Sequence, residues 1–134
     1  MSDAVGELRA MLAGMAPRLD PRRWRFVLVE PGNAPQLLGA AIATIREDEG
    51  VTAIVPARLA EELGMEGPDF ARITLTVHSD LEGIGLTAAV ASALADAGIA
   101  CNMIAAFHHD HAFVPADRGE EALEILSALQ AGHN

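Results

Sequence analysis

The sequence predicts an α/β fold in which short strands alternate with short helices, and three observations support this prediction. From Ala71 onward the strand and helix patterns follow the order β-α-β-β-α. A shorter version of the same pattern occurs earlier, so the chain contains an internal repeat. The 134 residues are 51% apolar, which is enough for one compact domain or for two very small ones that share a core.

The first half of the chain is expected to begin with a helix and a strand. The helix, residues 7–19, ends near Gly14 and Pro17. The strand, residues 23–30, is ended by a Pro-Gly pair. Later elements are a strand at 51–56 and a helix at 57–64, which begins after Pro56 and ends at Gly64.

The second half is expected to begin with a strand over residues 71–78, because β-branched residues alternate there. Apolar residues at helical spacing then predict a helix from Leu86 that Gly98 ends. The last helix is expected to begin with a capping box, with Asp117 at the N-cap and Glu120 three residues later. Two strands are expected between these helices, at residues 99–107 and 111–115.

The repeat resolves an ambiguous segment, residues 37–47, which fits a helix or a strand. The stretch "IATIREDEGVTAIVPARLAEEL" aligns with "IAAFHHDHAFVPADRGEEAL", and each contains strand, turn, strand, proline and helix. Residues 40–47 are therefore expected to form a strand, which leaves the first copy without a full helix between its strands. The β-α-β-β-α order is most of a ferredoxin-like βαββαβ unit. We expect two such units, the first incomplete, with strands shared or exchanged between them.

Charge and composition exclude several classes of partner. The net charge is −10 and the pI is about 4.7, so the surface repels phosphate backbones and nucleic acid is not expected. The N-terminal stretch lacks a basic region typical of secretory signals. The least polar run, residues 86–107, is interrupted by Asp96 and Gly98, so no membrane span is expected. These features predict a cytoplasmic protein, and Cys101, the single cysteine, is expected to be a buried small hydrophobe rather than a reactive thiol.

A candidate binding loop lies where the chain leaves the strand near residue 78 and enters the next helix. Free backbone N–H groups at a helix start favour a carboxylate. Gly83 and Gly85 remove side chains where a ligand would approach, although both glycines could serve only to make the turn. The predicted ligand-binding residues are Ser79, Asp80, Leu81, Glu82, Gly83, Ile84, Gly85 and Leu86.

A second candidate is the His-His-Asp-His cluster, which the repeat places at the tip of a tight hairpin. Successive strand residues point to opposite faces, so His108 and His109 cannot readily bind one ion. His109 and His111 could meet across the turn with Asp110 between them. That gives two or three ligands, fewer than the four of a closed zinc site, so no metal is expected.

A catalytic role for the cluster would need a nucleophile within reach of a base. Cys101 precedes the cluster by seven residues and should lie far from the tip, which leaves Ser79 as the other hydroxyl or thiol to consider. We therefore expect no catalytic residue. Asp110 is expected to supply the turn, with the imidazoles hydrogen-bonding locally or across to a neighbouring unit. A functional hairpin built on His109, Asp110 and His111 remains the alternative.

Two stretches resemble a known family. "DLEGIGLTAAVASALADAGIACNMI" resembles the ACT-domain motif, in which a strand is followed by D-x-P-G-x-L, a helix and G-I-x-x. "NMIAAFHHDHAFVPADRGEEAL" is similar to a segment of small bacterial stand-alone tandem ACT-like proteins, S-A-F-Y-H-D-H-x-F-V-P. The resemblance implies two ACT-type halves, residues 1–70 and 71–134. It also implies regulation by binding an amino acid or a related effector, without catalysis and without a cofactor.

The sequence departs from the family pattern at two positions. Ile84 stands where the family has a proline, and Glu82 stands where many amino-acid-binding members have an amide. A carboxylate there would attract the ammonium of a ligand and repel its carboxylate. Two other functions stay open, which are a metal- or histidine-dependent enzyme that uses the hairpin and an interaction module without a ligand.

A homodimer is expected because ferredoxin-like units leave one sheet face and the edge strands open. Apolar residues such as Ile73, Met103 and Phe107 are expected on these open surfaces, where a second copy would cover them.

Overall fold

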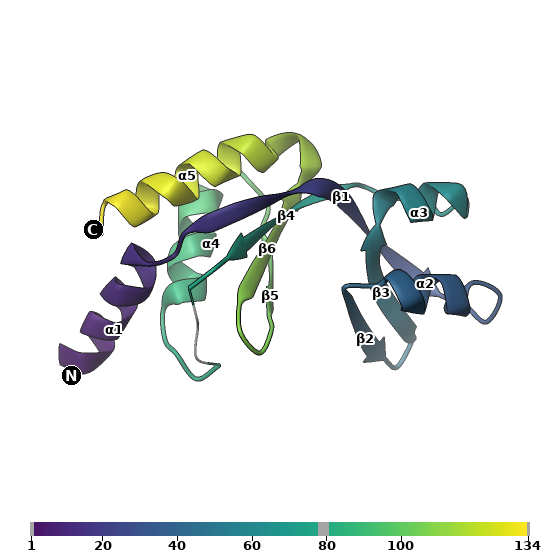
Figure 1. Cartoon of the computed structure of the whole chain (residues 1–134), viewed down its shortest axis with the longest axis horizontal. Coiled ribbons are helices and arrows are strands. Elements are labelled where there is room, and N and C mark those ends of the chain that lie inside the picture. The colour runs from purple at the N-terminus through teal and green to yellow at the C-terminus, as the bar shows by residue number, and fades with distance from the viewer. Residues whose placement is uncertain (1, 78–80, 134) are drawn as a thin grey trace. The chain divides into compact units, whose positions relative to one another are not determined.

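The computed structural model describes residues 2–77 and 81–133 (Figure 1). The chain divides into two compact units. We call residues 1–20 together with 71–134 the discontinuous unit, and residues 21–70, which the chain inserts into it, the inserted unit.

The discontinuous unit is a sheet with helices packed on it. Its strands are ordered β1-β4-β6-β5, and β5 pairs antiparallel with β6, from Asn102 opposite Phe113 to Ala105 opposite Asp110. Its elements are α1 (Ser2–Ala13), the first residues of β1 (Pro17–Val29), β4 (Phe70–Leu75), α4 (Leu86–Asp96), β5 (Asn102–Ala105), β6 (Asp110–Pro115), the 3₁₀ helix η1 (Ala116–Arg118) and α5 (Gly119–Ala131).

The order β4-α4-β5-β6-α5 matches the predicted β-α-β-β-α unit. The first residues of β1 add a strand beside β4. The set of strands and helices is therefore completed in space by a segment from much earlier in the chain. The predicted ferredoxin-like fold with shared strands is confirmed.

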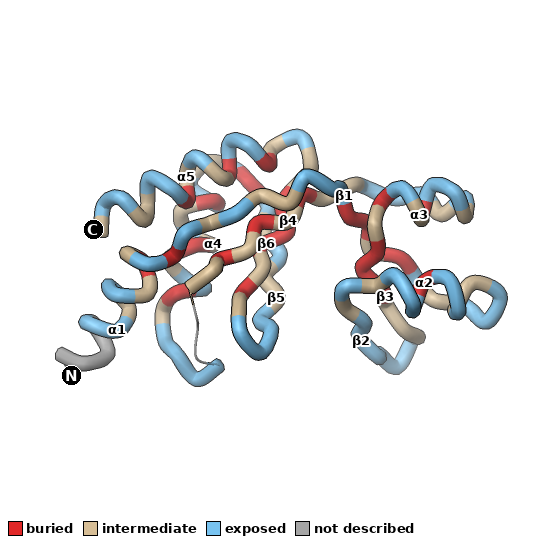
Figure 2. Tube along the Cα trace, in the orientation of Figure 1, coloured by how far each residue is buried: buried red, intermediate tan, exposed pale blue. Residues whose placement is uncertain are grey.

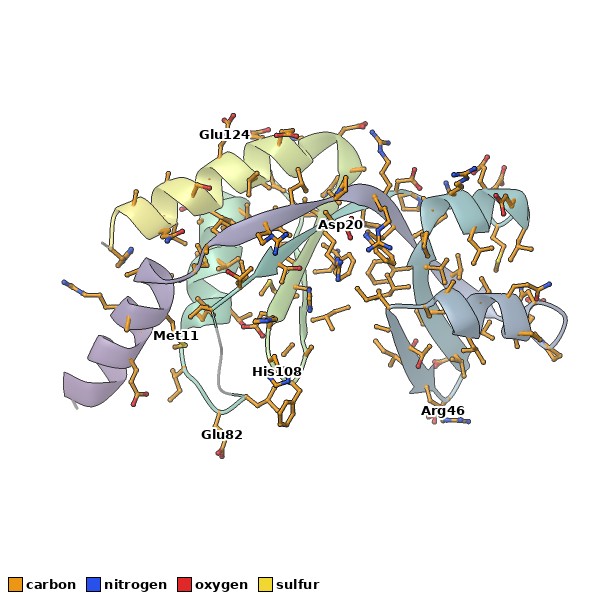
Figure 3. All side chains as sticks on the ribbon, in the orientation of Figure 1. Met11, Asp20, Arg46, Glu82, His108 and Glu124 are labelled. Atoms are coloured by element: carbon orange, nitrogen blue, oxygen red, sulfur yellow. The ribbon has the colours of Figure 1, made fainter. Side chains whose placement is uncertain are left out.

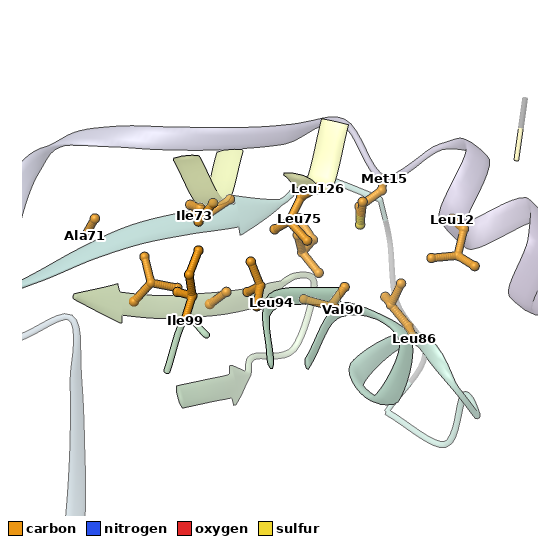
Figure 4. Close-up of a cluster of buried hydrophobic side chains, with 13 residues drawn as sticks. Leu12, Met15, Ala71, Ile73, Leu75, Leu86, Val90, Leu94, Ile99 and Leu126 are labelled. Carbon is orange, nitrogen blue, oxygen red and sulfur yellow. The ribbon is translucent and has the colours of Figure 1, made fainter. Parts of the chain in front are cut away.

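The core of the discontinuous unit lies between the sheet and its helices (Figure 4). Ile73 and Leu75 point into it because alternate residues of a strand share a face. Leu86, Val90 and Leu94 point into it from α4 because residues four apart share a helix face. Along α5, buried and exposed residues alternate in Figure 2, as expected of a helix with one face on a core.

This core corrects the expectation for two residues that were placed on an open surface. Ile73 is fully buried, because the same alternation that makes β4 a strand directs it towards the helices. Met103 is partly buried and packs against the same core. Phe107 does lie on the surface, with 80% of its area exposed.

The inserted unit has the strand order β2-β3-β1. Both pairs are antiparallel, and the register aligns Ile45, Thr52 and Leu28 in one row across the three strands. Its elements are the remainder of β1, α2 (Ala34–Ala40), β2 (Ala43–Glu47), β3 (Gly50–Pro56) and α3 (Ala57–Glu62). A smaller core forms between this sheet and its two helices, from Val27, Leu37, Ala53, Val55 and Ala60.

Helix α2 lies between β1 and β2 and has seven residues, compared with eleven in α4, so the first copy has a short helix there and lacks a full one, as expected. Its one proline and one glycine hid the helical pattern from periodicity alone. Proline is tolerated here because it occupies the first turn, where N–H groups have no partner within the helix. The assignment of a strand to the segment after it agrees with β2, which begins at Ala43.

A buried arginine connects the end of the inserted unit to its sheet. The Arg25 side chain donates to Asp69 Oδ1 at 2.9 Å, to Glu61 Oε2 at 3.0 Å and to the Met65 carbonyl at 2.7 Å. The hydrogen bond to Asp69, followed by that to Glu61, raises the pKa of Arg25. A buried charge needs such partners, and they hold the segment after α3 against β1.

The compact units do not coincide with the predicted halves 1–70 and 71–134. By its contacts, the stretch from Met1 to Asp20 belongs with the second half. The predicted boundary remains a proposal about the sequence repeats, since a strand that serves both units can be assigned to either.

The start of the last helix differs from its prediction. α5 begins at Gly119, after the 3₁₀ turn that contains Asp117, and its N-cap is Arg118, which makes no side-chain cap hydrogen bond. A Cβ at Gly119 would lie 2.9 Å from the Cβ of Ala71. The helix therefore passes too close to β4 for a larger residue, and this contact accounts for the glycine.

Candidate functional site

The predicted binding loop precedes α4, as expected. Gly85 is the N-cap of α4 with a φ of +100°, and a glycine at this position has no side chain with which to cap the helix. The first N–H groups of a helix have no partner within the helix, so those of α4 face the loop. Ser79 and Asp80 lie outside the described residues.

The described loop residues differ in what they can offer to a ligand. The side chains of Leu81 and Ile84 are 63% and 77% exposed, and Glu82 and Gly83 are exposed as well. Leu86 is 3% exposed and belongs to the core. Its side chain therefore cannot contact a ligand at this surface, and its possible contribution is its backbone N–H group.

Helix α1 borders this loop, and no pattern in the sequence predicts this contact. Glu7 and Met11 line a cavity of about 70 Å³ together with Glu82, Gly83 and Ile84. Figure 3 labels Met11 on α1 and Glu82 on the loop. About 70 residues separate the two segments in sequence, and no local pattern reports a contact of that range.

The histidine hairpin is built differently from the prediction. The turn comprises residues 106–109, closed by the Ala106 N–H donating to the His109 carbonyl at 2.9 Å. Asp110 does not form the turn, because it is the first residue of β6, pairs with Ala105 and is 5% exposed. His108 lies at the tip (Figure 3), where its ring meets Phe107 edge-on at 5.0 Å.

The two remaining histidines contact the neighbouring strand and its continuation. His111 Nδ1 lies 3.0 Å from Thr74 Oγ1 on β4, and His109 Nδ1 lies 3.4 Å from the Val77 carbonyl. Both partners are more than 30 residues away in sequence, so neither hydrogen bond is local to the hairpin. The hairpin turn therefore contacts Val77, at the end of the described residues that follow β4.

Electrostatics at the hairpin favour a neutral imidazole. Burial lowers the pKa of His111, and the positive charges of Arg72 and His109 lower it further, against a smaller opposite effect of Asp110. In a neutral ring, Nδ1 of His111 can accept a hydrogen bond that the Thr74 hydroxyl donates. Residues 2–77 and 81–133 contain no group of three or more His, Cys, Asp or Glu residues that could hold a metal ion.

Cys101 immediately precedes β5 and is half-buried. Burial raises the pKa of its thiol, which disfavours the thiolate that a nucleophile requires. The thiol is therefore poorly suited to catalysis at neutral pH.

Comparison with known proteins identifies the family. Two family models match, both described as ACT domain, one over residues 4–72 and the other over residues 70–128. The chain therefore belongs to the ACT-domain family. Membership of this family supports a regulatory, ligand-binding role. No curated protein matches it.

Several solved structures are similar to this chain. A Vibrio cholerae protein of unknown function, described as a possible transport protein, is 38% identical with a TM-score of 0.82, over 95% of this chain and 98% of that one. The ligand-free regulatory subunit of aspartate kinase from Thermus thermophilus is 16% identical with a TM-score of 0.64, over 87% of this chain and 97% of that one. E. coli aspartokinase III, with aspartate and ADP, is 16% identical with a TM-score of 0.60, over 85% of this chain and 33% of that one.

The two aspartate kinase structures support the fold.

Within the described part of the chain, no helix has the length and apolar character needed to cross a membrane.

Proposed function

We propose that this protein is a non-catalytic regulatory protein of the cytoplasm that binds an amino acid or a related small effector. The observation that carries the proposal is the loop before α4, in a chain that two ACT-domain models match. An uncapped helix start with a glycine at its N-cap offers backbone N–H groups to an anionic group.

The charges at the loop favour a zwitterion over a simple anion. The N–H groups at the start of α4 suit the carboxylate of an amino acid, and the carboxylate of Glu82, which lines the adjoining cavity, suits its ammonium group. A purely anionic effector would be repelled by this carboxylate.

The test is a thermal-shift screen against the twenty amino acids, nucleotides and divalent metal ions. A compound at 100 times its Kd adds about 2.7 kcal/mol to the free energy of unfolding, which corresponds to several degrees in Tm for a chain of this size. We expect an amino acid to raise the Tm. A rise with metal ions alone would favour the enzyme interpretation instead.

A pair of variants then locates the site. Glu82→Gln removes a charge from the loop and should weaken binding of a zwitterionic amino acid by about tenfold. Glu124→Gln is the matched control, because this exposed residue lies on α5, away from the loop (Figure 3). Equal affinity of both variants, with weaker binding after His109→Gln, would place the ligand at the hairpin.

We also propose that the protein is a homodimer and that β2 is part of its interface. Leu28 and Ile45 are 50% and 48% exposed on the sheet face away from α2 and α3. Leu38 and Ile42 are 50% and 37% exposed on α2 and just after it. Exposed apolar side chains therefore lie on one face of this sheet and on α2, and Ile45 belongs to β2, which is the last strand in the order of the inserted unit.

The side chains of β2 are compatible with a second copy in two-fold antiparallel pairing. A two-fold axis at Ile45 would place this residue against its own copy. Arg46 would then lie opposite Thr44, and Glu47 opposite Ala43, so no like charges would face each other. The proposed partner is thus another copy of this chain.

A further inference from the structure

We propose that α1 is a displaceable cover over the binding loop, so that a ligand must move α1 to reach the start of α4. This inference rests on the proposed function of that loop. It assigns a role to a helix that precedes β1 and lies outside the βαββα unit.

The first argument is direct contact between α1 and the N-cap of α4. A Cβ placed on Gly85 would lie 2.9 Å from Leu8 Cδ2 and 3.3 Å from Leu8 Cδ1. The Leu8 side chain therefore packs on the backbone of Gly85, at the place where a ligand would approach the N–H groups of α4. Glu7 and Met11 flank Leu8 on the same side of α1 and line the cavity beside it.

The second argument is the lack of space. The cavity between α1 and the loop measures about 70 Å³, whereas small-molecule sites usually measure about 300–1,000 Å³. With α1 in this position the cavity is too small for an amino acid. Either the ligand binds elsewhere or α1 moves.

The third argument is that the two ends of α1 are held unequally. At its C-terminal end, Leu12 and Met15 are buried, and the Gln130 side chain donates to the Ala13 carbonyl at 2.8 Å and accepts from the Ala16 N–H at 3.0 Å. Among residues 6–10, only Leu8 is half-buried and the others are exposed. The N-terminal half of the described helix can therefore detach while its C-terminal end stays in place.

The expected consequence is that α1, in its covering position, lowers the apparent affinity for the ligand. If only molecules with α1 displaced bind the ligand, the apparent Kd is the intrinsic Kd divided by the fraction of displaced molecules. Weakening the contact of Leu8 should then tighten binding. If α1 instead contacted the bound ligand as part of the site, weakening the contact of Leu8 would weaken binding.

The experiment measures the affinity of the full chain for each of the twenty amino acids by calorimetry. Leu8→Ala removes the contact with Gly85 and keeps a good helix former. The matched control is Arg9→Lys, which changes the next, exposed residue and keeps its charge. We expect Leu8→Ala to bind about 3-fold to 10-fold more tightly than the wild type, and Arg9→Lys to bind equally. If Leu8→Ala binds as tightly as the wild type or more weakly, α1 is not a cover, and the proposed function of the loop still stands.

Hydrogen exchange tests the cover without a ligand. In the free protein, the amides of residues 6–11 should exchange at least roughly 100-fold faster than those of residues 90–94 in the buried α4, and faster still in Leu8→Ala. Equal protection of the two helices would overturn the cover on its own. If no amino acid binds the wild type or Leu8→Ala, the proposed function fails, and the exchange result still decides whether α1 detaches.

Discussion

At the scale of single residues, position in the fold decides what each group at the candidate site can do. Gly85 and Leu86 are neighbours, yet one is a left-handed N-cap at the loop and the other a core residue. In the hairpin, Asp110 and His111 occupy opposite faces of β6, and only the histidine reaches the Thr74 hydroxyl. Two residues that are adjacent in sequence can therefore have quite different roles at the site.

The first prediction concerns Gly85→Val. A φ of +100° is strained for valine, and its side chain would collide with Leu8, so we expect a loss of about 1 kcal/mol or more in the free energy of unfolding and a loss of ligand binding. Gly39→Ala is the control. A Cβ there meets nothing within 4 Å, and alanine is the better helix former, so stability should stay equal or rise by up to about 1 kcal/mol. Urea unfolding of both variants measures the difference, and a Gly85→Val protein as stable as the wild type would contradict the argument.

The second prediction concerns pH and His111, whose pKa the fold lowers. The unfolded chain then takes up the proton first, at about its ordinary pKa of 6.5. The contribution of His111 to stability is therefore present above that pH and is lost as the pH falls towards the lowered pKa. We expect His111→Gln to lose less Tm than the wild type between pH 7.5 and 5.5. A His108→Gln control should lose as much as the wild type, and an equal loss in all three proteins would contradict the assignment.

At the scale of elements, individual side chains connect helices and loop segments that are not joined by strand pairing. Gln130 holds the end of α1 through two backbone groups. Arg118 joins two helices, since it donates to the Ala97 carbonyl at the end of α4 while paired with Glu121 on α5. Arg25 does the same for the segment that follows α3.

The third prediction ranks the two acidic partners of Arg25. The Asp69 side chain is 24% exposed and that of Glu61 is 75% exposed. Water screens an exposed pair, so Glu61→Gln should cost less than about 1 kcal/mol. Asp69→Asn should cost more, because it leaves a buried guanidinium with a weaker acceptor. Chemical denaturation of the two variants tests the ranking, and an equal or reversed order would show that Asp69 is not the main partner.

At the scale of the whole molecule, the duplicated pattern is combined with a strand that serves both units. Residues 17–20 of β1 belong to the discontinuous unit and the rest of the strand to the inserted unit. Cutting the chain at residue 70 would therefore remove a strand and α1 from the second unit. We expect the half 71–134 not to be independently stable for this reason.

The fourth prediction concerns the proposed dimer. Light scattering at micromolar concentration should give twice the mass of the chain. Ile45→Arg should shift the protein towards monomers, because it places two like charges next to the proposed two-fold axis. Thr87→Arg, at an exposed position of α4, adds the same charge elsewhere and should stay dimeric. A wild-type monomer would refute the dimer, and a dimeric Ile45→Arg would refute this interface.

Features that depend on neighbours along the chain could be predicted from the amino-acid sequence. The alternation in β4, the four-residue spacing in α4 and the glycine at its start predicted a strand, a helix and the loop between them. The two copies of the repeat predicted the paired hairpins and the ferredoxin-like fold. Such patterns are local because the side-chain periodicity of a strand or a helix can be recognised within a few consecutive residues.

The contacts between segments that are distant in sequence could be found only from the folded structure. It brought α1 onto the binding loop, placed Ile73 in the core and gave His111 its partner on β4. It also revealed that Gly119 is required by a close approach to Ala71 rather than by a turn. These contacts join residues about 40 to 80 positions apart. They depend on how whole elements pack, and the periodicity of a single element carries no information about its partner.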